Sequence, residues 1–332
     1  MLIIPAVIII IALSILQINP LTAVRDNFIT PDSQAVVLGE QNNEGIVMGV
    51  SEAADGALPV QSTAILPASG EKDITPFKKG VHMAEPEISA SSAIVIDAAS
   101  QKVLMEKNAD GPSSIASITK LITALVALDH QPDFAGEYTM REEDRRDGGR
   151  INLFWGDKIS IEDLFNASLV GSDNTATIAL VHALGFSEPE FVAKMNEKAG
   201  ELGLKNTNFV DPIGLSSNNK STAREVAKII EAALAREKIQ QTVIQNKYIL
   251  KTKQGKARTI ESTDILLNKK NGYEILGGKT GYLGSAGFCF AGKFKEYEQE
   301  IISVVLGSEG VDLRFSETDE LVRWAYENYV WP

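Results

Sequence analysis

Ser117 and Lys120 are the first pair of residues whose types and spacing suit nucleophilic chemistry. A serine hydroxyl is a weak nucleophile until a neighbouring base accepts its proton. In a helix, residues three apart lie on one face, so Lys120 would stand beside the Ser117 hydroxyl. A lysine serves as that base when burial and nearby positive charge lower its pKa. A helix N-cap serine followed by a solvated lysine would give the same pattern.

The same spacing recurs at Ser217 and Lys220, so the pattern alone is weak evidence. Ser117 leads into the apolar helical run 121–128, which can bury the pair. Ser217 lies instead in a polar turn before the next helix. We therefore favour Ser117 as the nucleophile.

Two further short motifs carry polar groups that suit the same chemistry. Ser172-Asp173-Asn174 places a hydroxyl and an amide on one loop, where they can relay a proton and hold a peptide carbonyl. Such a triplet is more often a cap or a turn, and Ser216-Ser217-Asn218 resembles it. In Lys279-Thr280-Gly281 the lysine adds positive charge, the threonine can bind a carboxylate, and the glycine lets a substrate backbone approach closely. Each motif is common, but the three in this order are not.

The elements around these motifs predict an α+β fold. Strand-like runs come first, helical periodicity dominates from Ser117 to about Arg236, and further strand-like runs with a final amphipathic helix follow. The predicted strands are Ser92–Ala98, Lys102–Glu106, Gly278–Tyr282, Gly287–Lys293 and Ile301–Gly307, and the last helix is Glu317–Tyr329. This order indicates an antiparallel sheet assembled from both ends of the chain, with helices packed on it.

The composition excludes several classes of function. The chain has 332 residues, with 44 acidic and 32 basic side chains, so its formal net charge is −12. Nucleic acid, which is itself polyanionic, is therefore not an expected partner. The single cysteine, Cys289, excludes an intrachain disulfide and a site of several thiolates, and three histidines do not favour a metal centre. We expect catalysis without a metal ion or a cofactor.

The chain divides into three parts by composition. Residues 1–18 are almost wholly apolar, which is typical of a membrane-spanning helix or of the apolar core of a signal sequence. Residues 19–87 are acidic, contain several prolines and have only Phe28 and Phe77 as aromatic residues, which predicts a flexible linker. Residues 88–332 form the predicted catalytic domain.

The ordered motifs and their flanks resemble the low-molecular-mass serine D-alanyl-D-alanine carboxypeptidases, a family of penicillin-binding acyltransferases. The resemblance spans roughly Ile88 to Val330, and the chain departs from the family pattern at Ile115, Asp173 and Leu283. It implies a five-stranded antiparallel sheet with helices on both faces and a helical subdomain. The stretches that carry it are SAIVIDAASQKVLMEKNAD, GGRINLFWGDKISIEDLFNASLVGSDNTATIAL, FVAKMNEKAGELGLKNTNFVDPIGLS, STAREVAKI, GGKTGYLGSAGFCFAG and RFSETDELVRWAYENY.

The resemblance also implies a role for each reacting residue. Ser117 would attack the carbonyl of the penultimate D-alanine of a peptidoglycan stem peptide. Lys120 would accept the Ser117 proton, with Lys279 helping to lower the pKa of Lys120. Ser172 would pass a proton to the leaving amine, and Asn174 would orient Lys120 and the substrate amide. A β-lactam, which mimics the terminal dipeptide, would acylate Ser117 and leave slowly.

Other residues of the motifs would bind the substrate. The backbone N–H groups of Ser117 and Tyr282 would form an oxyanion hole, with donors aimed at the charge that develops in the transition state. Thr280 and Arg314 would hold the terminal carboxylate, and Gly281 would let the substrate lie close to the strand. The assignment of Arg314 rests on the stretch RFSET alone.

Three other functions share parts of this pattern. A D,D-endopeptidase that cleaves peptidoglycan cross-links would use the same residues. A class A β-lactamase would need a glutamate after the second motif, whereas the similar stretch that starts at Glu162 precedes it. A non-catalytic peptidoglycan-binding protein would not need every reacting group. For the favoured enzyme, the resemblance implies a place on the extracytoplasmic face of a bacterial membrane, anchored by residues 1–18 or secreted if they are removed.

Overall fold

The computed structural model describes residues 74–81, 83–149 and 152–332. The membrane or signal helix expected at residues 1–18 lies outside the described residues, and so does the linker up to residue 73. No helix within the described ranges is both long and apolar enough to span a membrane. The structure therefore concerns the expected catalytic domain and the last residues of the linker.

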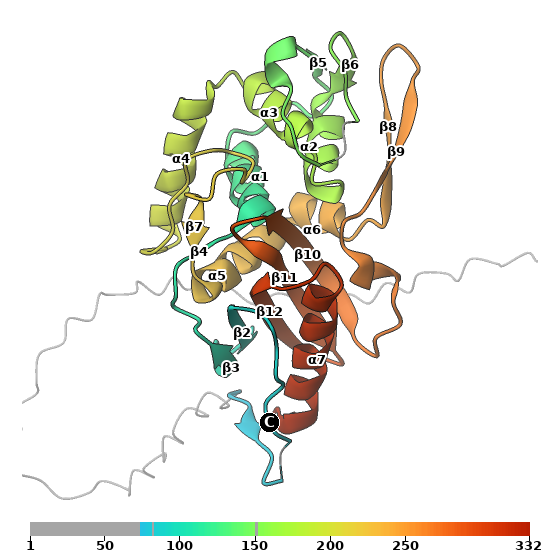
Figure 1. Cartoon of the computed structure of the whole chain (residues 1–332). Helices are drawn as coiled ribbons and strands as arrows, with labels where there is room; N and C mark the ends of the chain where they lie inside the picture. Colours follow the sequence, from blue (N-terminus) through green and yellow to red (C-terminus); the bar gives the residue numbers. More distant parts are fainter. Residues whose placement is uncertain (1–73, 82, 150–151) are drawn as a thin grey trace, which may run out of the picture. The chain divides into compact units, whose positions relative to one another are not determined.

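A five-stranded antiparallel sheet forms the centre of the domain (Figure 1). Strand β2, near the start of the domain, pairs with β12, near its end, from Asp97 opposite Ile301 to Ser92 opposite Leu306. The expected antiparallel sheet assembled from both ends of the chain is thereby confirmed. In spatial order the strands are β10 (Glu274–Leu283), β11 (Gly287–Glu296), β12 (Gln299–Ser308), β2 (Ser92–Asp97) and β3 (Val103–Lys107).

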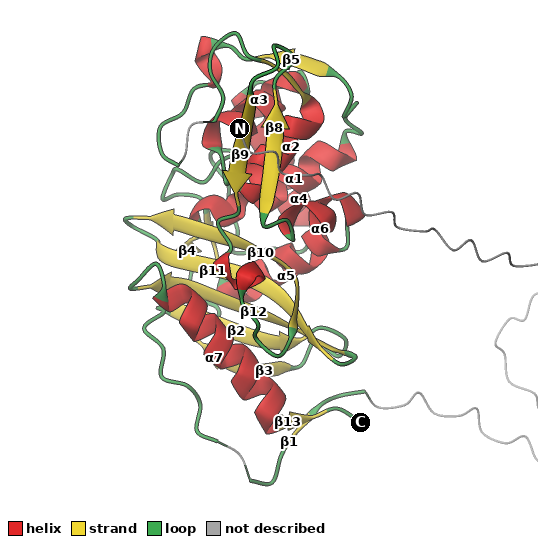
Figure 2. Cartoon of the chain, turned by 90° about the vertical axis from the view of Figure 1, so that its right-hand side faces the viewer, coloured by secondary structure: helices red, strands yellow, loops and turns green. Residues whose placement is uncertain are grey.

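Side chains on the inner strands are buried on both faces of the sheet, because successive residues of a strand point to opposite sides. In β2, Ile94 and Ile96 join one apolar cluster, while Ala93 and Val95 join the other. Helix α5 (Ala223–Leu234) packs on the first face, and the long helix α7 (Leu313–Asn328) packs on the second (Figure 2). The expectation of helices on both faces is confirmed.

Beside the sheet lies a helical subdomain (Figure 1). Its helices are α1 (Lys120–Asp129), α2 (Ile161–Val170), α3 (Asn174–Ala183), α4 (Glu188–Glu201) and α6 (Glu237–Val243). Side-chain caps fix where α2 and α3 begin: Ser160 accepts from the Asp163 N–H group, and Asp173 accepts from the Ala176 N–H group. The second of these caps places the motif at residues 172–174 at a helix N-terminus.

Short hairpins and single turns connect the larger elements. The hairpin formed by β8 and β9 extends from the helical subdomain in Figure 1 and was not predicted from the sequence. The paired short strands are β4 (Ser113–Ser114) with β7 (Lys220–Ser221), β5 (Glu137–Thr139) with β6 (Lys158–Ser160), and β8 (Lys247–Lys251) with β9 (Ala257–Glu261). The 3₁₀ turns are η1 (Ala116–Thr119), η2 (Glu142–Asp144) and η3 (Ile265–Asn268).

The last residues of the expected linker pack on the domain. Strand β1 (Phe77–Lys78) pairs antiparallel with β13 (Tyr329–Val330) at the other end of the chain. The Lys79 N–H group donates to the Asn328 carbonyl over 2.9 Å, and the Met83 N–H group donates to the Asn328 side chain over 2.6 Å. Composition does not reveal these contacts, because they use backbone groups and need no core within the segment. The folded domain therefore begins upstream of the boundary expected at residue 88.

A chain that begins at Glu85 is expected to unfold at a lower temperature than one that begins at Ile74. The shorter chain loses the β1–β13 pairing and the hydrogen bonds of Met83, each worth about 1 kcal/mol net. A loss of about 2–3 kcal/mol corresponds to a fall of roughly 5–10 °C in Tm for a domain of this size. Scanning calorimetry measures the difference, and equal Tm values would show that this segment adds nothing to stability.

Candidate active site

Ser117 lies on the turn η1, directly before helix α1. The apolar side chains of Ile118, Leu121 and Ile122 are fully buried and anchor this part of the chain in the core. Ala116 adopts a φ of 46°, a left-handed conformation that residues with a Cβ atom rarely take. Packing around the turn therefore holds it in an unusual shape, with Ser117 half-buried in the wall of a cavity.

Lys120 is fully buried behind Ser117, and three oxygen atoms surround its Nζ atom. Nζ lies 3.0 Å from Ser117 Oγ, 2.7 Å from Asn174 Oδ1 and 2.7 Å from the carbonyl oxygen of Ile213. The oxygens of Asn174 and Ile213 can only accept hydrogen bonds, so a neutral amine gives them its two N–H groups. The lone pair of that amine then faces the Ser117 hydroxyl, which is the geometry of a general base.

The orientation of the Asn174 amide follows from its other contacts. Its Nδ2 atom donates to the carbonyl oxygens of Asp147 and Gly148 over 3.1 and 3.2 Å. Because these two partners require the amide nitrogen, the Oδ1 atom must face Lys120. The segment that contains Asp147 and Gly148 thus fixes how Asn174 meets the base.

Ser172 and Lys279 meet across the cavity from different parts of the chain. Lys279 Nζ donates to Ser172 Oγ over 2.8 Å and to the Thr280 carbonyl oxygen over 3.0 Å. Ser172 has a φ of 55°, so its backbone is in the left-handed region at the bend between α2 and α3. This bend aims the Ser172 hydroxyl at strand β10 and leaves Asn174 at the start of α3.

Burial sets the protonation of both lysines. It lowers the pKa of Lys120 to about 7, although the carboxylates of Asp173 and Asp211 favour the charged form. Burial also lowers the pKa of Lys279, and the positive charges of Lys120 and Arg314 lower it further. Burial, rather than the Lys279 charge that the resemblance implied, is therefore the main reason why Lys120 holds a free amine near neutral pH.

The variant Asp173→Asn is expected to move the acid limb of the pH–rate profile for acylation to lower pH. The Asp173 carboxylate raises the pKa of Lys120, so its removal lowers that pKa and leaves more free amine at a given pH. The expected shift is downward, while asparagine still caps α3. Stopped-flow acylation across the pH range measures the limb. The surface variant Glu201→Gln should leave it in place, and a limb that moves upward in Asp173→Asn would contradict this assignment.

Two glycines let neighbouring segments close on the turn η1. A Cβ atom added to Gly281 would lie 2.7 Å from the carbonyl oxygen of Ile115. A Cβ atom added to Gly214 would lie 2.0 Å from the carbonyl oxygen of Ala116, and Gly214 also has a φ of 82°. Only glycine fits both positions. Gly281 belongs to a motif predicted from the sequence, whereas Gly214 was not predicted, and its sole signal was its place in the stretch DPIGLS.

Strand β10 forms the opposite wall of the cavity. Thr280 Oγ1 lies 2.6 Å from Thr263 Oγ1, so a second hydroxyl orients the first. Thr263 was not predicted from the sequence. The Tyr282 side chain is exposed, and its ring stacks on Phe288 with 4.4 Å between ring centroids. This edge of β10 is therefore open to a substrate laid alongside it.

The cavity that these elements enclose has a volume of about 700 Å³. Lys120 and Lys279 lie behind its surface, each almost completely buried. The structure thus brings the residues of all three motifs to one place, although the motifs lie far apart in the sequence. The suggested residues that line the cavity are Ser117, Ser172, Asn174, Thr280, Gly281, Tyr282 and Arg314.

Arg314 lies at the base of the same cavity but is largely buried. Its Nη1 atom donates to the Gly281 carbonyl oxygen over 3.1 Å. Its guanidinium group lies 5.6 Å from the ring centroid of Phe288 and 4.6 Å from that of Phe315. Arg314 therefore supports β10 directly, and the expected contact with a substrate carboxylate would use its remaining donors.

The competing sequence patterns lie elsewhere on the surface. Ser217 and Lys220 are both exposed and do not line the cavity. Glu162, which superficially suited a class A β-lactamase, is half-exposed in the first turn of α2 and forms an ion pair with Lys238. Neither pattern contributes to the site around Ser117.

Comparisons with known proteins agree with this geometry. The sequence pattern of the D-alanyl-D-alanine carboxypeptidase family matches residues 79–310. The D-alanyl-D-alanine endopeptidase of Pseudomonas aeruginosa is 32% identical over 252 residues, which cover 75% of this chain and 81% of that protein. The D-alanyl-D-alanine carboxypeptidase DacF of Bacillus subtilis is 30% identical over 258 residues, which cover 75% of this chain and 65% of that protein.

Solved structures share the fold. The DD-transpeptidase of Streptomyces K15 superposes with a TM-score of 0.69 at 25% identity, covering 74% of this chain and 100% of that chain. A D-alanyl-D-alanine carboxypeptidase from Mycobacterium tuberculosis superposes with a TM-score of 0.68 at 26% identity, covering 76% of this chain and 96% of that chain.

Fold and family together define a serine peptidase of the penicillin-binding type. The chain belongs to the D-alanyl-D-alanine carboxypeptidase family, and the resemblance seen in its sequence is confirmed.

Proposed function

We propose that the protein removes the terminal D-alanine from peptidoglycan stem pentapeptides through an acyl-enzyme on Ser117. The observation that carries the proposal is the surroundings of Lys120 Nζ. Two obligate acceptors, Asn174 Oδ1 and the Ile213 carbonyl, take its N–H groups and turn its lone pair to Ser117 Oγ, 3.0 Å away. Ser217, by contrast, is exposed, and so is Lys220 three residues further on.

In the first half-reaction Ser117 Oγ forms a bond to the carbonyl carbon of the penultimate D-alanine. The hydroxyl proton moves to Lys120 Nζ. The backbone N–H groups of Ser117 and Tyr282 stabilise the oxyanion. As the C–N bond breaks, the leaving amine takes a proton through Ser172, whose Oγ atom is 2.8 Å from Lys279 Nζ. Free D-alanine and an ester on Ser117 result.

In the second half-reaction water attacks the ester, the bond from the carbonyl carbon to Ser117 Oγ breaks, and the shortened peptide leaves with a carboxyl group while a proton of the water restores the Ser117 hydroxyl. Earlier, when the intact peptide binds, Thr280 holds its terminal carboxylate with help from the unused donors of Arg314. A β-lactam enters by the same first step. Its ring opens without releasing a leaving group from the site, so the acyl-enzyme persists and the antibiotic acts as a covalent inhibitor.

Release of D-alanine from a short synthetic peptide that ends in D-Ala-D-Ala tests the proposal. The full-length protein should release one D-alanine per peptide, measured with a D-amino acid oxidase assay. A peptide that ends in D-Ala-L-Ala serves as the matched control and should not be cleaved. Chromatography of the intact peptide measures this control, because the oxidase does not respond to L-alanine. Absence of release from the first peptide, with a protein that is correctly folded, would contradict the proposal.

A D,D-endopeptidase is the second candidate function. The family relative in Pseudomonas aeruginosa that matches 75% of this chain carries that name. The same acyl-enzyme chemistry on Ser117 would then act on the D-alanyl bond of a cross-link. Parallel assays with a pentapeptide and with a cross-linked muropeptide dimer separate the two functions. Faster turnover of the pentapeptide supports the carboxypeptidase, and cleavage of the dimer alone supports the endopeptidase.

For the location of the protein we propose the extracytoplasmic face of a bacterial membrane, with residues 1–18 as the anchor. The support is the apolar character of this run, which has no charged side chain. Fractionation of cells that express the full-length chain should recover it with membranes, in a state resistant to salt extraction. Recovery in the culture medium with residues 1–18 missing would show instead that the run is a cleaved signal.

A further inference from the structure

A second cleft, of about 400 Å³, opens beside the catalytic cavity on the helical subdomain. Its floor is apolar, its rim is aromatic, and two arginines stand at its edge. We call it the accessory cleft, and the residues that line it are Met140, Arg141, Glu142, Arg145, Leu153, Phe154, Trp155 and Thr175. None of them takes part in the chemistry proposed for Ser117.

Two large aromatic side chains of the accessory cleft face solvent. Trp155 is 78% exposed and Phe154 is 55% exposed, whereas Met140 and Leu153 below them are buried. The guanidinium group of Arg258 lies 5.0 Å from the ring centroid of Phe154 and covers one of its faces. The Trp155 indole keeps an open face, and an exposed aromatic ring can stack on the apolar face of a ligand.

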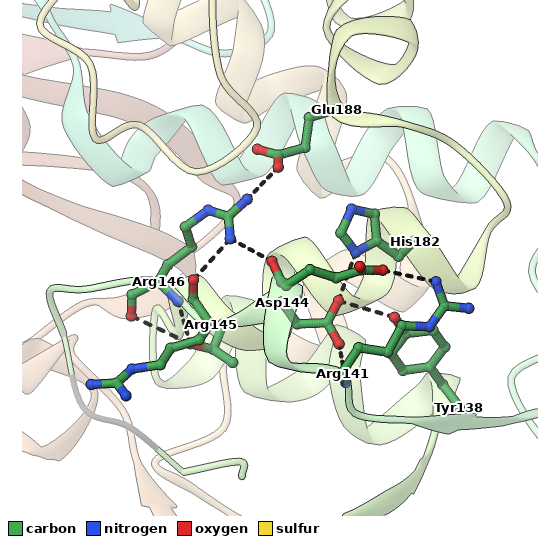
Figure 3. A network of polar contacts seen from close by, with 9 residues as sticks. Tyr138, Arg141, Asp144, Arg145, Arg146, His182 and Glu188 are labelled. Carbon is green, nitrogen blue, oxygen red and sulfur yellow. Dashed lines mark hydrogen bonds and ion pairs between the residues drawn. The ribbon is translucent and has the colours of Figure 1, made fainter. Parts of the chain in front are cut away.

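The lining of the accessory cleft carries two arginines and one glutamate, Glu142, and so has a net charge of +1 in a chain whose net charge is −12. Figure 3 shows the Arg145 guanidinium pointing away from the neighbouring polar network, and no described residue forms an ion pair with it. Arg141 is also largely exposed and contacts Glu143 over 3.1 Å with one nitrogen, which leaves further donors. Arginine binds carboxylates through such paired donors. The chemistry of the edge therefore suits an anionic ligand.

The buried carboxylate of Asp144 holds the backbone that carries these arginines (Figure 3). Asp144 is completely buried and accepts hydrogen bonds from the Tyr138 hydroxyl at 3.0 Å and from the Arg141 N–H group at 2.6 Å. The Nδ1 atom of His182 on α3 lies 2.6 Å from the same carboxylate. A cleft fixed in this way before its ligand arrives loses little freedom on binding.

The accessory cleft adjoins the catalytic cavity. Thr175 lines the cleft and Asn174 lines the cavity, and the Cα atoms of consecutive residues are about 3.8 Å apart. The segment that begins at Arg141 continues to Gly148 and Gly149, which line the cavity. A stem peptide with its scissile carbonyl at Ser117 has about three residues upstream, which span roughly 10 Å when extended. A segment of that length can extend from the cavity toward the neighbouring cleft.

We propose that the accessory cleft binds the upstream end of the same stem peptide, where the peptide carries carboxylates and joins an amino sugar. This inference rests on the proposed function. Carboxylates of the stem bind Arg145 and Arg141, and the sugar ring stacks on the open face of Trp155.

Two substrates test the accessory cleft in the full-length protein: a disaccharide pentapeptide and an acetylated tripeptide that ends in D-Ala-D-Ala. In Trp155→Ala and in Arg145→Gln, the ratio of kcat/KM for the disaccharide pentapeptide to that for the tripeptide should fall about tenfold, through KM. Tyr297→Ala provides the matched control, because Tyr297 is 86% exposed and does not line the cleft. That control should keep the ratio of the unmodified protein.

Calorimetry with the disaccharide pentapeptide and the Ser117→Ala protein measures binding without turnover. Adding Trp155→Ala should weaken Kd about tenfold. An unchanged ratio and an unchanged Kd would overturn the proposal. A parallel fall for both substrates would also overturn it, since the cleft would then act only by supporting Asn174. Failure of the proposed function would give a different result from failure of this proposal. The unmodified protein would then release no D-alanine, while the Kd for the disaccharide pentapeptide would still test whether the cleft binds it.

Discussion

Replacing Ser117 with alanine is expected to abolish turnover of D-alanyl-D-alanine peptides and covalent labelling by penicillin, each by roughly 10⁴-fold or more. The variant removes the only atom proposed to bond to the substrate. Lys120 would keep its contacts with Asn174 and Ile213, so the fold should survive. Peptide assays and fluorescent penicillin on a gel measure the two losses.

The matched control is Ser217→Ala. Ser217 has the same spacing to a lysine, Lys220, but both residues are exposed and lie outside the cavity. Turnover and labelling should remain within about twofold of the unmodified protein. Retained labelling in Ser117→Ala, or loss of labelling in Ser217→Ala, would show that the nucleophile has been assigned to the wrong motif.

The second large effect is expected from Gly214→Ala, which changes no reacting group. An alanine Cβ atom would lie 2.0 Å from the Ala116 carbonyl oxygen and 3.0 Å from the Ser117 nitrogen. The backbone of η1 must shift to relieve this overlap, and the Ser117 hydroxyl moves with it. A displacement of about 1 Å between reacting groups can cost roughly 100-fold in rate. Stopped-flow acylation by penicillin should therefore slow by about that factor.

Gly255→Ala separates this overlap from backbone strain. Gly255 has a φ of 83°, close to the 82° of Gly214, but nothing lies within 4 Å of a Cβ atom added there. Both variants should lose about 1 kcal/mol of stability from the left-handed backbone, and only Gly214→Ala should slow acylation. Equal acylation rates in the two variants would show that η1 tolerates the added atom.

Much of the fold could be predicted because it follows local patterns. The apolar, β-branched runs Ser92–Ala98 and Ile301–Gly307 predicted two strands that turn out to pair in the sheet as β2 and β12. The apolar run at residues 121–128 predicted the helix that buries Lys120. Given this order of strands and helices along the chain, few arrangements were possible other than one sheet built from strands at both ends of the domain.

The parts of the site that were missed consist of backbone groups and remote contacts. The carbonyl of Ile213 accepts a hydrogen bond from Lys120 although the two residues are 93 positions apart, and no side-chain type in the sequence predicts this contact. Gly214 matters only because another segment passes against it. Thr263 orients Thr280 from an irregular stretch after β9. Such partners follow from the assembled fold, so a motif of three or four residues does not predict them.

Composition did not predict where the folded domain begins. A segment with few aromatic residues lacks a core of its own, which is why residues 74–87 were assigned to the linker. Strand β1 nevertheless pairs with β13, because an edge of backbone N–H and C=O groups is enough to hold two residues. Pairing of this kind leaves little trace in hydrophobicity or charge.

Mass spectrometry of the intact protein after incubation with benzylpenicillin tests the central claim most directly. Opening of the β-lactam ring by Ser117 Oγ expels no atoms, so the protein should gain the full mass of one penicillin molecule. Peptide mapping should then place that mass on the peptide that contains Ser117. A protein that gains no mass, or one that carries the adduct on Ser217 or any other residue, would contradict the assignment of Ser117 as the acylated nucleophile.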